Sequence, residues 1–160
     1  MSHKMQEEKL VKVLYVLPFS RILRDEDLGF GAYIVGLRLI LENDKSFILV
    51  NVPYEVASAI KMINEGEVPP RRQSLFDLLA NNEEFRKIFS DTLKRVIIDE
   101  LDQDTGLYTA TVEFEQDNVK FSLKMIPSHA IYLALVTGKP IYVAESLVDE
   151  DEELDLDEDW

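Results

Sequence analysis

Few side chains in this chain of 160 residues could carry chemistry: two histidines and a handful of carboxylates. Cysteine is absent, which excludes thiolate metal sites and cysteine nucleophiles. His129 follows Pro127 at the predicted start of a helix, where the positive end of the helix dipole favours a neutral imidazole. A neutral imidazole can bind a metal ion or accept a proton, but a histidine in a first helical turn can also simply form local hydrogen bonds.

Five carboxylates could act as general bases or as ligands of a hard cation such as Mg²⁺ or Mn²⁺: Glu55, Asp77, Asp99, Glu100 and Asp102. Strand alternation places Glu100 and Asp102 on one face, where they could hold such an ion or simply be solvated. Glu55 stands in the first turn of a predicted helix, and Asp99 lies where a predicted strand approaches an acidic turn. Asp77 follows Ser74 by three residues, a spacing typical of a capping box, so a structural role is the simpler interpretation for this residue.

Six of the 17 basic residues of the chain fall within one segment of 25 residues. This basic segment could bind phosphate groups or an acidic peptide, or it could be an ordinary mixed helix surface. Its members are Arg71, Arg72, Arg86, Lys87, Lys94 and Arg95.

The net charge of −14 is concentrated at the C-terminus. Nine of the 31 acidic residues lie in residues 149–160, so the rest of the chain carries a net charge of only −5. Such a body is a poor general binder of phosphate backbones, although a local basic groove or a metal–carboxylate site is compatible with it. We expect the acidic tail to be solvated, or to bind a protein partner or mask the basic segment through Leu154, Leu156 and Trp160.

Apolar periodicity and turn residues predict two strand meanders that alternate with helices. Strands are predicted at residues 11–17, 34–41, 47–52, 96–101, 107–115, 119–125 and 141–144, with a less regular stretch at residues 18–31. Three helices are predicted, from Pro53 to Gly66, from Ser74 to Phe89 with a break or kink at residues 81–82, and from Pro127 to Gly138.

The two halves of the sequence resemble each other, because Phe47, Leu49, Val52 and Pro53 recur 74 positions later as Phe121, Leu123, Ile126 and Pro127. We therefore predict an α+β fold built from a duplicated β-β-α unit, with a mostly antiparallel sheet packed against about three helices. Residues 1–10 are predicted to be a flexible N-terminus, residues 11–148 one domain, and residues 149–160 an acidic tail. No apolar run approaches the ~20 residues of a membrane span, and no signal peptide is evident, so we expect a soluble, cytoplasmic protein.

Three stretches of the sequence resemble the bifunctional nuclease (BFN, DUF151) family. They are FILVNVPYEVASAI at residues 47–60, VPPRRQSLFDLL at residues 68–79 with KRVIIDEL and LYTA after it, and PSHAIYLALVTGKPIYVAE at residues 127–145. The last is similar to the family pattern RPSDAIALALxxGxPI[FY]V. Three family residues differ: the Arg before Pro-Ser is Ile126, the Asp after Pro-Ser is His129, and a frequent Thr-His-Asp is Leu75-Phe76-Asp77.

This resemblance implies a compact α+β domain, often a homodimer, that acts on DNA and RNA. Residues Glu55, Arg71, Asp77 and Asp99 match family positions. On this hypothesis Glu55, Asp77, Asp99 and His129 are catalytic candidates, and the metal ligands for Mg²⁺ or Mn²⁺ are Glu55, Asp99 and His129. Arg71 and Arg72 would bind phosphate. The alternative is a non-catalytic dimeric interaction or regulatory module with a partner-binding acidic tail.

Overall fold

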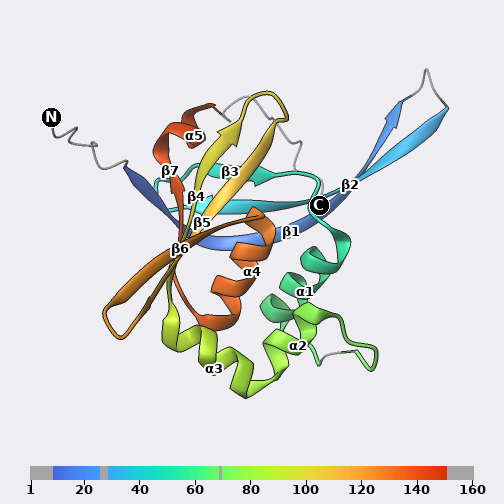
Figure 1. The fold of residues 1–160 in the computed structure, drawn as a ribbon. Coiled ribbons are helices and arrows are strands. Elements are labelled where there is room, and N and C mark those ends of the chain that lie inside the picture. The colour runs from blue at the N-terminus through green and yellow to red at the C-terminus, as the bar shows by residue number, and fades with distance from the viewer. Residues whose placement is uncertain (1–8, 26–28, 69, 151–160) are drawn as a thin grey trace, which may run out of the picture.

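A seven-stranded sheet, with the strands in the order β3-β2-β1-β7-β4-β5-β6, forms the centre of the fold (Figure 1). The computed structural model describes residues 9–25, 29–68 and 70–150, so Leu154, Leu156 and Trp160 lie outside the described residues. The strands are β1 (Leu10–Asp25), β2 (Phe30–Leu41), β3 (Ser46–Leu49), β4 (Leu93–Asp102), β5 (Leu107–Gln116), β6 (Val119–Met125) and β7 (Ile141–Ala144).

Five helices are present in the described part of the chain, where the sequence predicted about three. Four of them, α1 to α4, lie together below the sheet in Figure 1, whereas α5 lies at the upper end beside β7. Their bounds are α1 (Tyr54–Glu65), α2 (Leu75–Asn81), α3 (Glu83–Thr92), α4 (Pro127–Thr137) and α5 (Glu145–Glu150). No described helix is long and apolar enough to span a membrane.

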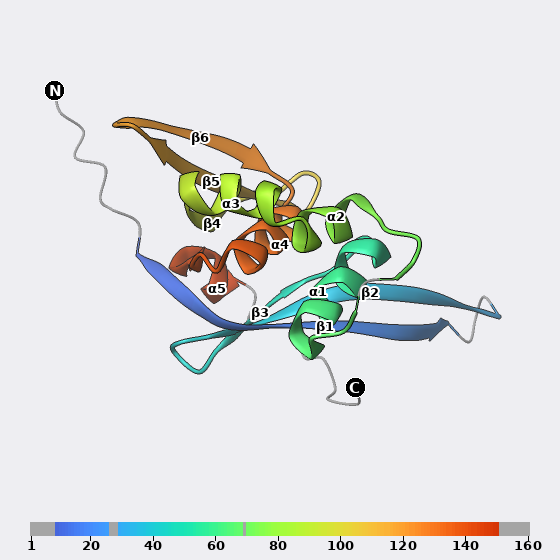
Figure 2. The same ribbon diagram turned by 90° about the horizontal axis from the view of Figure 1, so that it is seen from below.

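The topology consists of two similar wings joined by β7. One wing is β1-β2-β3 followed by α1, the other is β4-β5-β6 followed by α4, and every strand pair is antiparallel except β4–β7. Figure 2 shows the two wings from below, with α1 on one and α4 between them. The mostly antiparallel α+β fold is therefore confirmed, while the duplication of a β-β-α unit stays a prediction.

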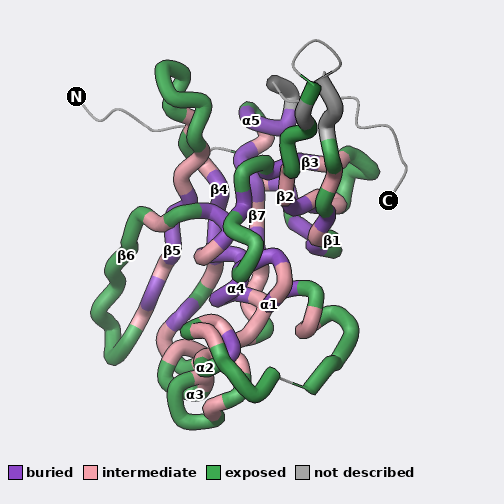
Figure 3. Tube along the Cα trace, turned by 90° about the vertical axis from the view of Figure 1, so that its right-hand side faces the viewer, coloured by how far each residue is buried: buried purple, intermediate pink, exposed green. Residues whose placement is uncertain are grey.

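The core lies between the sheet and helices α1 and α4, where Figure 3 shows buried segments. Helix α4 supplies the most continuous apolar surface, because its residues from Pro127 to Ala134 are buried except for His129. Both α1 and α4 end at glycines in the left-handed region, Gly66 with φ 65° and Gly138 with φ 68°, which stops each helix at the predicted place.

Residues 18–25 and 30–31 lie in regular strands, contrary to the prediction. β1 continues to Asp25 and pairs with β2 as a long hairpin from Val13↔Leu41 to Asp25↔Phe30, which projects to the right in Figure 1. β7 pairs only with the first three residues of β1, so beyond them β1 has a strand on one side alone in the described structure. Proline is tolerated in an edge strand of this kind, because it has no N–H to donate to a neighbouring strand. Pro18 lies in this part of β1, where only β2 pairs with it.

Candidate functional site

A cleft of about 600 Å³ opens between the first turns of α1 and the segment that leads into α2. Glu55, Arg72 and Asp77, three of the residues singled out in the sequence, line this cleft together. Ser58 and Gln73 add polar groups to its wall. The fold therefore brings two carboxylates and one guanidinium group into a single concave site, although they are up to 22 positions apart in the sequence.

The start of α1 places Glu55 in the lining of the cleft. Pro53 precedes the helix with an extended backbone, and Glu55 is the acidic residue in the first turn. The positive end of the helix dipole stabilises a negative charge there. The side chain is exposed, so it is accessible to solvent and to a substrate.

Asp77 has the structural role that its spacing predicted. Its Oδ2 accepts hydrogen bonds from the backbone N of Ser74 at 2.9 Å and from Ser74 Oγ at 3.0 Å, and the backbone N of Asp77 donates to Ser74 Oγ at 3.2 Å. This reciprocal capping box begins α2. The Oδ1 atom accepts no hydrogen bond from the described residues and is not sealed from solvent, so one oxygen of this buried carboxylate stays available.

Aromatic residues connect Asp77 to the start of α4. The ring of Phe76 packs edge-on against both His129 and Tyr132, with centroid distances of 5.2 Å in each case. The hydroxyl of Tyr132 donates a hydrogen bond to the backbone oxygen of Phe76. Burial raises the pKa of Tyr132 above its ordinary value, and the negative charge of Asp77 raises it further. His129 thus packs against Phe76 of α2 and is not among the residues that line the cleft.

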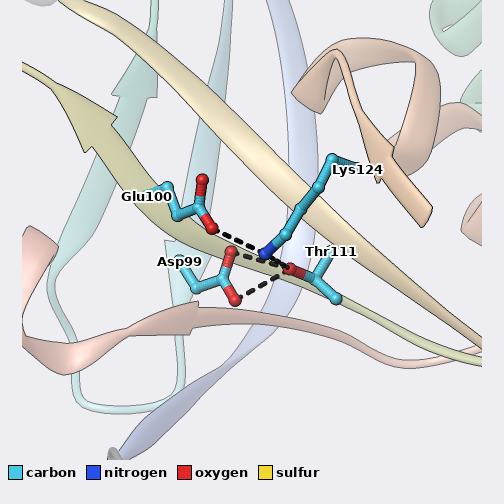
Figure 4. Close-up of polar contacts among 4 residues, drawn as sticks. All are labelled: Asp99, Glu100, Thr111 and Lys124. Atoms are coloured by element: carbon cyan, nitrogen blue, oxygen red, sulfur yellow. Dashed lines mark hydrogen bonds and ion pairs between the residues drawn. The ribbon is translucent and has the colours of Figure 1, made fainter. Parts of the chain in front are cut away.

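Asp99 lies in a different part of the structure. Both of its oxygens accept the hydroxyl of Thr111, at 3.0 and 2.9 Å, and Thr111 Oγ1 also accepts from Lys124 Nζ at 2.7 Å (Figure 4). Lys124 forms an ion pair of 2.6 Å with Glu100, which is the main reason that the pKa of Lys124 is raised. Thr111 is itself buried, but it alternates with the core residues Ala110 and Val112, so this cluster lies on the opposite face of β5.

The predicted metal ligands Glu55, Asp99 and His129 are therefore not brought together in this structure. Within the described residues no group of three histidine, aspartate or glutamate side chains is close enough to hold a metal ion. Mg²⁺, however, is commonly bound by one or two carboxylates with waters and substrate phosphates as the other ligands. Glu55 and the open Oδ1 of Asp77 line the same cleft and could supply the carboxylates of such a site.

The basic segment is divided between different sites. Arg72 lines the cleft, and Arg71 is exposed beside it in the sequence. Arg86 donates to the backbone oxygen of Ala80 at 3.1 Å, and Arg95 forms a bidentate pair with Glu113 at 2.6 and 3.2 Å. Sequence reasoning missed Ser58 and Gln73. The i, i+3 spacing of Glu55 and Ser58, which places both on one helix face, could have indicated the first of these.

Comparison with known proteins identifies the family. The family model of the Bifunctional nuclease domain matches residues 39–155, which include the cleft and both wings from the last residues of β2 onward. A search of curated proteins gave no match. Because the family model covers well over half of the sequence, the chain belongs to the bifunctional nuclease domain family.

Proposed function

We propose that this chain is a metal-dependent nuclease that hydrolyses phosphodiester bonds of DNA or RNA in the cleft between α1 and α2. One observation carries the proposal: the cleft is lined by Glu55, Asp77 and Arg72, whose types match the three tasks of that reaction. Membership of the bifunctional nuclease domain family supports the same reaction class.

Each of these side chains has a definite role in the proposed reaction. Arg72 binds the non-bridging oxygens of the scissile phosphate, for which a guanidinium group is well suited. Glu55 accepts a proton from the attacking water. The water oxygen forms a bond to phosphorus while the bond from phosphorus to a ribose or deoxyribose oxygen breaks. Asp77 Oδ1 and Glu55 would hold Mg²⁺ or Mn²⁺, which when bound lowers the pKa of water and neutralises developing charge.

A second candidate function, a non-catalytic dimeric interaction module, is favoured by a separate observation. Three apolar side chains of β1, Leu14, Tyr15 and Leu17, are exposed on the surface of the sheet. Such a patch suits a homodimer interface. A homodimer is compatible with either function, so we propose it for both. Light scattering at several concentrations would test it, with Tyr15→Asp expected to yield monomers and Leu107→Asp, at another exposed position, expected to leave the mass unchanged.

The nuclease proposal is tested by cleavage of single- and double-stranded DNA and RNA in Mg²⁺, Mn²⁺ or EDTA. Glu55→Gln removes the proton acceptor and should lower metal-dependent cleavage by about 100-fold or more. Glu65→Gln is the matched control, because Glu65 is also exposed on α1 but lies at its other end. Equal cleavage by the wild type and Glu55→Gln would contradict the site, and no cleavage by any protein would favour the interaction module.

A further inference from the structure

A second cleft, of about 380 Å³, adjoins the proposed catalytic cleft across helix α1. Both clefts are lined by Tyr54, Ser58 and Met62, which recur at intervals of four residues and so form one stripe along the helix. On one side of this stripe the catalytic cleft continues to Glu55, and on the other side the second cleft continues to Lys61. The two clefts are therefore neighbours, and a chain bound in one can extend over the stripe into the other.

The long hairpin of β1 and β2 forms the opposite wall of the second cleft. Its lining includes Pro18 and Ser20 of β1 and Tyr33 and Val35 of β2. These residues lie on the face of the sheet that carries the core, because Pro18 pairs with the buried Leu37 and residues two positions apart point to the same face. The hairpin extends beyond α1 (Figure 2), so this end of the core-bearing face is open to a ligand beside the helix.

Two tyrosines of the second cleft are strongly exposed. Tyr54 is 65% exposed and Tyr33 is 59% exposed. They come from different elements, α1 and β2, and line the same cleft. An exposed aromatic ring beside a polar cleft is a surface on which a nucleobase can stack, because every base has a π-face. The second cleft therefore offers aromatic surface next to the residues proposed to act on phosphate.

The charged side chains in the described lining of the second cleft balance each other. Lys61 is the basic residue of this lining and Glu67 is the acidic one. A side-chain hydrogen bond with Glu65, together with its negative charge, raises the pKa of Glu67, while the positive charge of Lys61 acts in the opposite direction. Phosphate groups require basic side chains, whereas an uncharged base does not. The second cleft thus suits a base, and the catalytic cleft, which holds Arg72, suits the phosphate.

We propose that the second cleft binds an unpaired base of the substrate, next to the phosphate that Arg72 holds. The base stacks on Tyr54, Tyr33 adds a second aromatic surface, and the hydroxyls of Ser20 and Ser58 offer hydrogen bonds to the base edge. A base inside a duplex is stacked and paired and cannot enter such a cleft, so the substrate class is single-stranded DNA or RNA. This inference rests on the proposed nuclease function, because it places the base relative to the phosphate of that reaction.

A second copy of the chain is a poorer occupant of this cleft. Ser20, Ser58, Lys61 and Glu67 are interspersed with the tyrosines of the lining. The central part of a protein interface is depleted of charged residues, and this lining has two of them. A nucleobase, in contrast, combines an apolar face for the tyrosines with donors and acceptors on its edge for the polar groups.

Two single strands that have the same phosphates but differ in their bases test the proposal. One is a DNA of about ten nucleotides, and the other has an abasic tetrahydrofuran unit at every position. Binding of both to the full-length protein is measured by fluorescence anisotropy in Ca²⁺ and in EDTA, with the strands shown to be intact by gel electrophoresis. The wild type should bind the strand with bases about 5-fold or more tightly, the gain expected from stacking one base.

Variants of Tyr54 assign this preference to the second cleft. Tyr54→Ala should remove most of the preference and leave the binding of the abasic strand unchanged. Tyr54→Phe keeps the aromatic ring and should retain the preference, which a loss of fold would not allow. Phe85→Ala is the matched control, because it removes an exposed ring of α3 that lies outside the described lining of both clefts.

Several results would overturn the base site. The wild type could bind the two strands equally or bind neither, or Tyr54→Ala could weaken both strands to the same extent. Conversion of a dimer to monomers by Tyr54→Ala, with the base preference unchanged, would assign the ring to an interface between copies.

Failure of the nuclease proposal would look different. A base preference that depends on Tyr54, without metal-dependent cleavage, would support the base site and contradict the reaction. Metal-dependent cleavage that depends on Glu55, without any base preference, would support the reaction and overturn the base site.

Discussion

The ring of Phe76 meets the imidazole of His129 edge-on, at 5.2 Å between centroids and an interplanar angle of 73°. These are two of the positions at which the sequence differs from the family pattern, where histidine and aspartate are usual. The structure places the two positions in direct contact across α2 and α4. A histidine and an aspartate placed at these two positions would therefore be neighbours in this fold.

Restoring the polar pair should increase cleavage. In Phe76→His/His129→Asp the carboxylate can orient the imidazole next to Asp77, and a positioned acid–base group contributes about 10²–10⁴-fold to a rate. We expect metal-dependent cleavage to rise at least about 10-fold, measured as initial rates on single-stranded substrates. Phe76→His alone is the control, since it lacks the orienting carboxylate. An unchanged rate in the double variant would show that this contact does not affect the chemistry.

The structural and chemical roles of Asp77 can be separated through its capping partner. Ser74→Ala removes the cap of α2 and should lower the free energy of unfolding by about 0.5–2 kcal/mol in urea titrations. Cleavage should change little, because the side chain of Asp77 remains. Asp77→Asn should produce a similar loss of stability and, in addition, a large loss of metal-dependent cleavage. If Ser74→Ala abolishes cleavage as well, the carboxylate acts only by shaping α2.

Stability should decline at alkaline pH because of Tyr132. Its pKa in the folded protein is raised by burial and by Asp77, so the folded state keeps the proton where the unfolded state loses it. The contribution is complete below the unfolded pKa of about 10 and is lost as the pH rises above that value. Urea unfolding from about pH 8 to pH 11 should show this loss in the wild type and a smaller one in Tyr132→Phe. Parallel curves for both proteins would exclude Tyr132 as the cause.

Asp99 should not be required for cleavage. Its carboxylate is bonded to Thr111 on the sheet face away from the core, outside the lining of the cleft. Asp99→Asn should leave metal-dependent cleavage within about twofold of the wild type. The neighbouring Glu100–Lys124 pair is exposed, so Glu100→Gln should change the free energy of unfolding by less than about 1 kcal/mol. A strong loss of cleavage in Asp99→Asn would place the catalytic site on this cluster.

Local signals in the sequence predicted the elements with well-defined ends. Pro127 and Gly138 delimit α4, and Ser74 with Asp77 begins α2, because proline, a cap and a left-handed glycine act on their own helix. The kink expected at residues 81–82 is the cap of α3, where Asn82 accepts from two backbone N–H groups. The second half of β1 was missed, because pairing with β2 decides its structure and no local pattern encodes that pairing.

The candidate site was predicted only as a set of separate residues. The sequence placed Glu55 and Asp77 correctly in the first turns of two helices. It could not show that both line one cleft, because that depends on how α1 and α2 pack. Asp77 lies at the start of α2 and Asp99 lies near the end of β4, so their sequence positions gave no reason to separate them. The hydrogen bonds of Asp99 to Thr111 on β5 show that it lies away from the cleft. Helix α5 was missed because its last two residues, Asp149 and Glu150, were assigned to the acidic tail.

The four residues of β7 also set an order for biosynthesis. Among the described strands, β7 is the one that pairs with both wings, with three register pairs to β1 and three to β4, and it lies at residues 141–144 of the chain. A chain growing from its N-terminus can form each meander from local contacts, but the sheet stays in two pieces until its last strand is made. Until then β1 and β4 each present an unpaired edge, so an incomplete chain that ends before residue 141 is the form most exposed to aggregation.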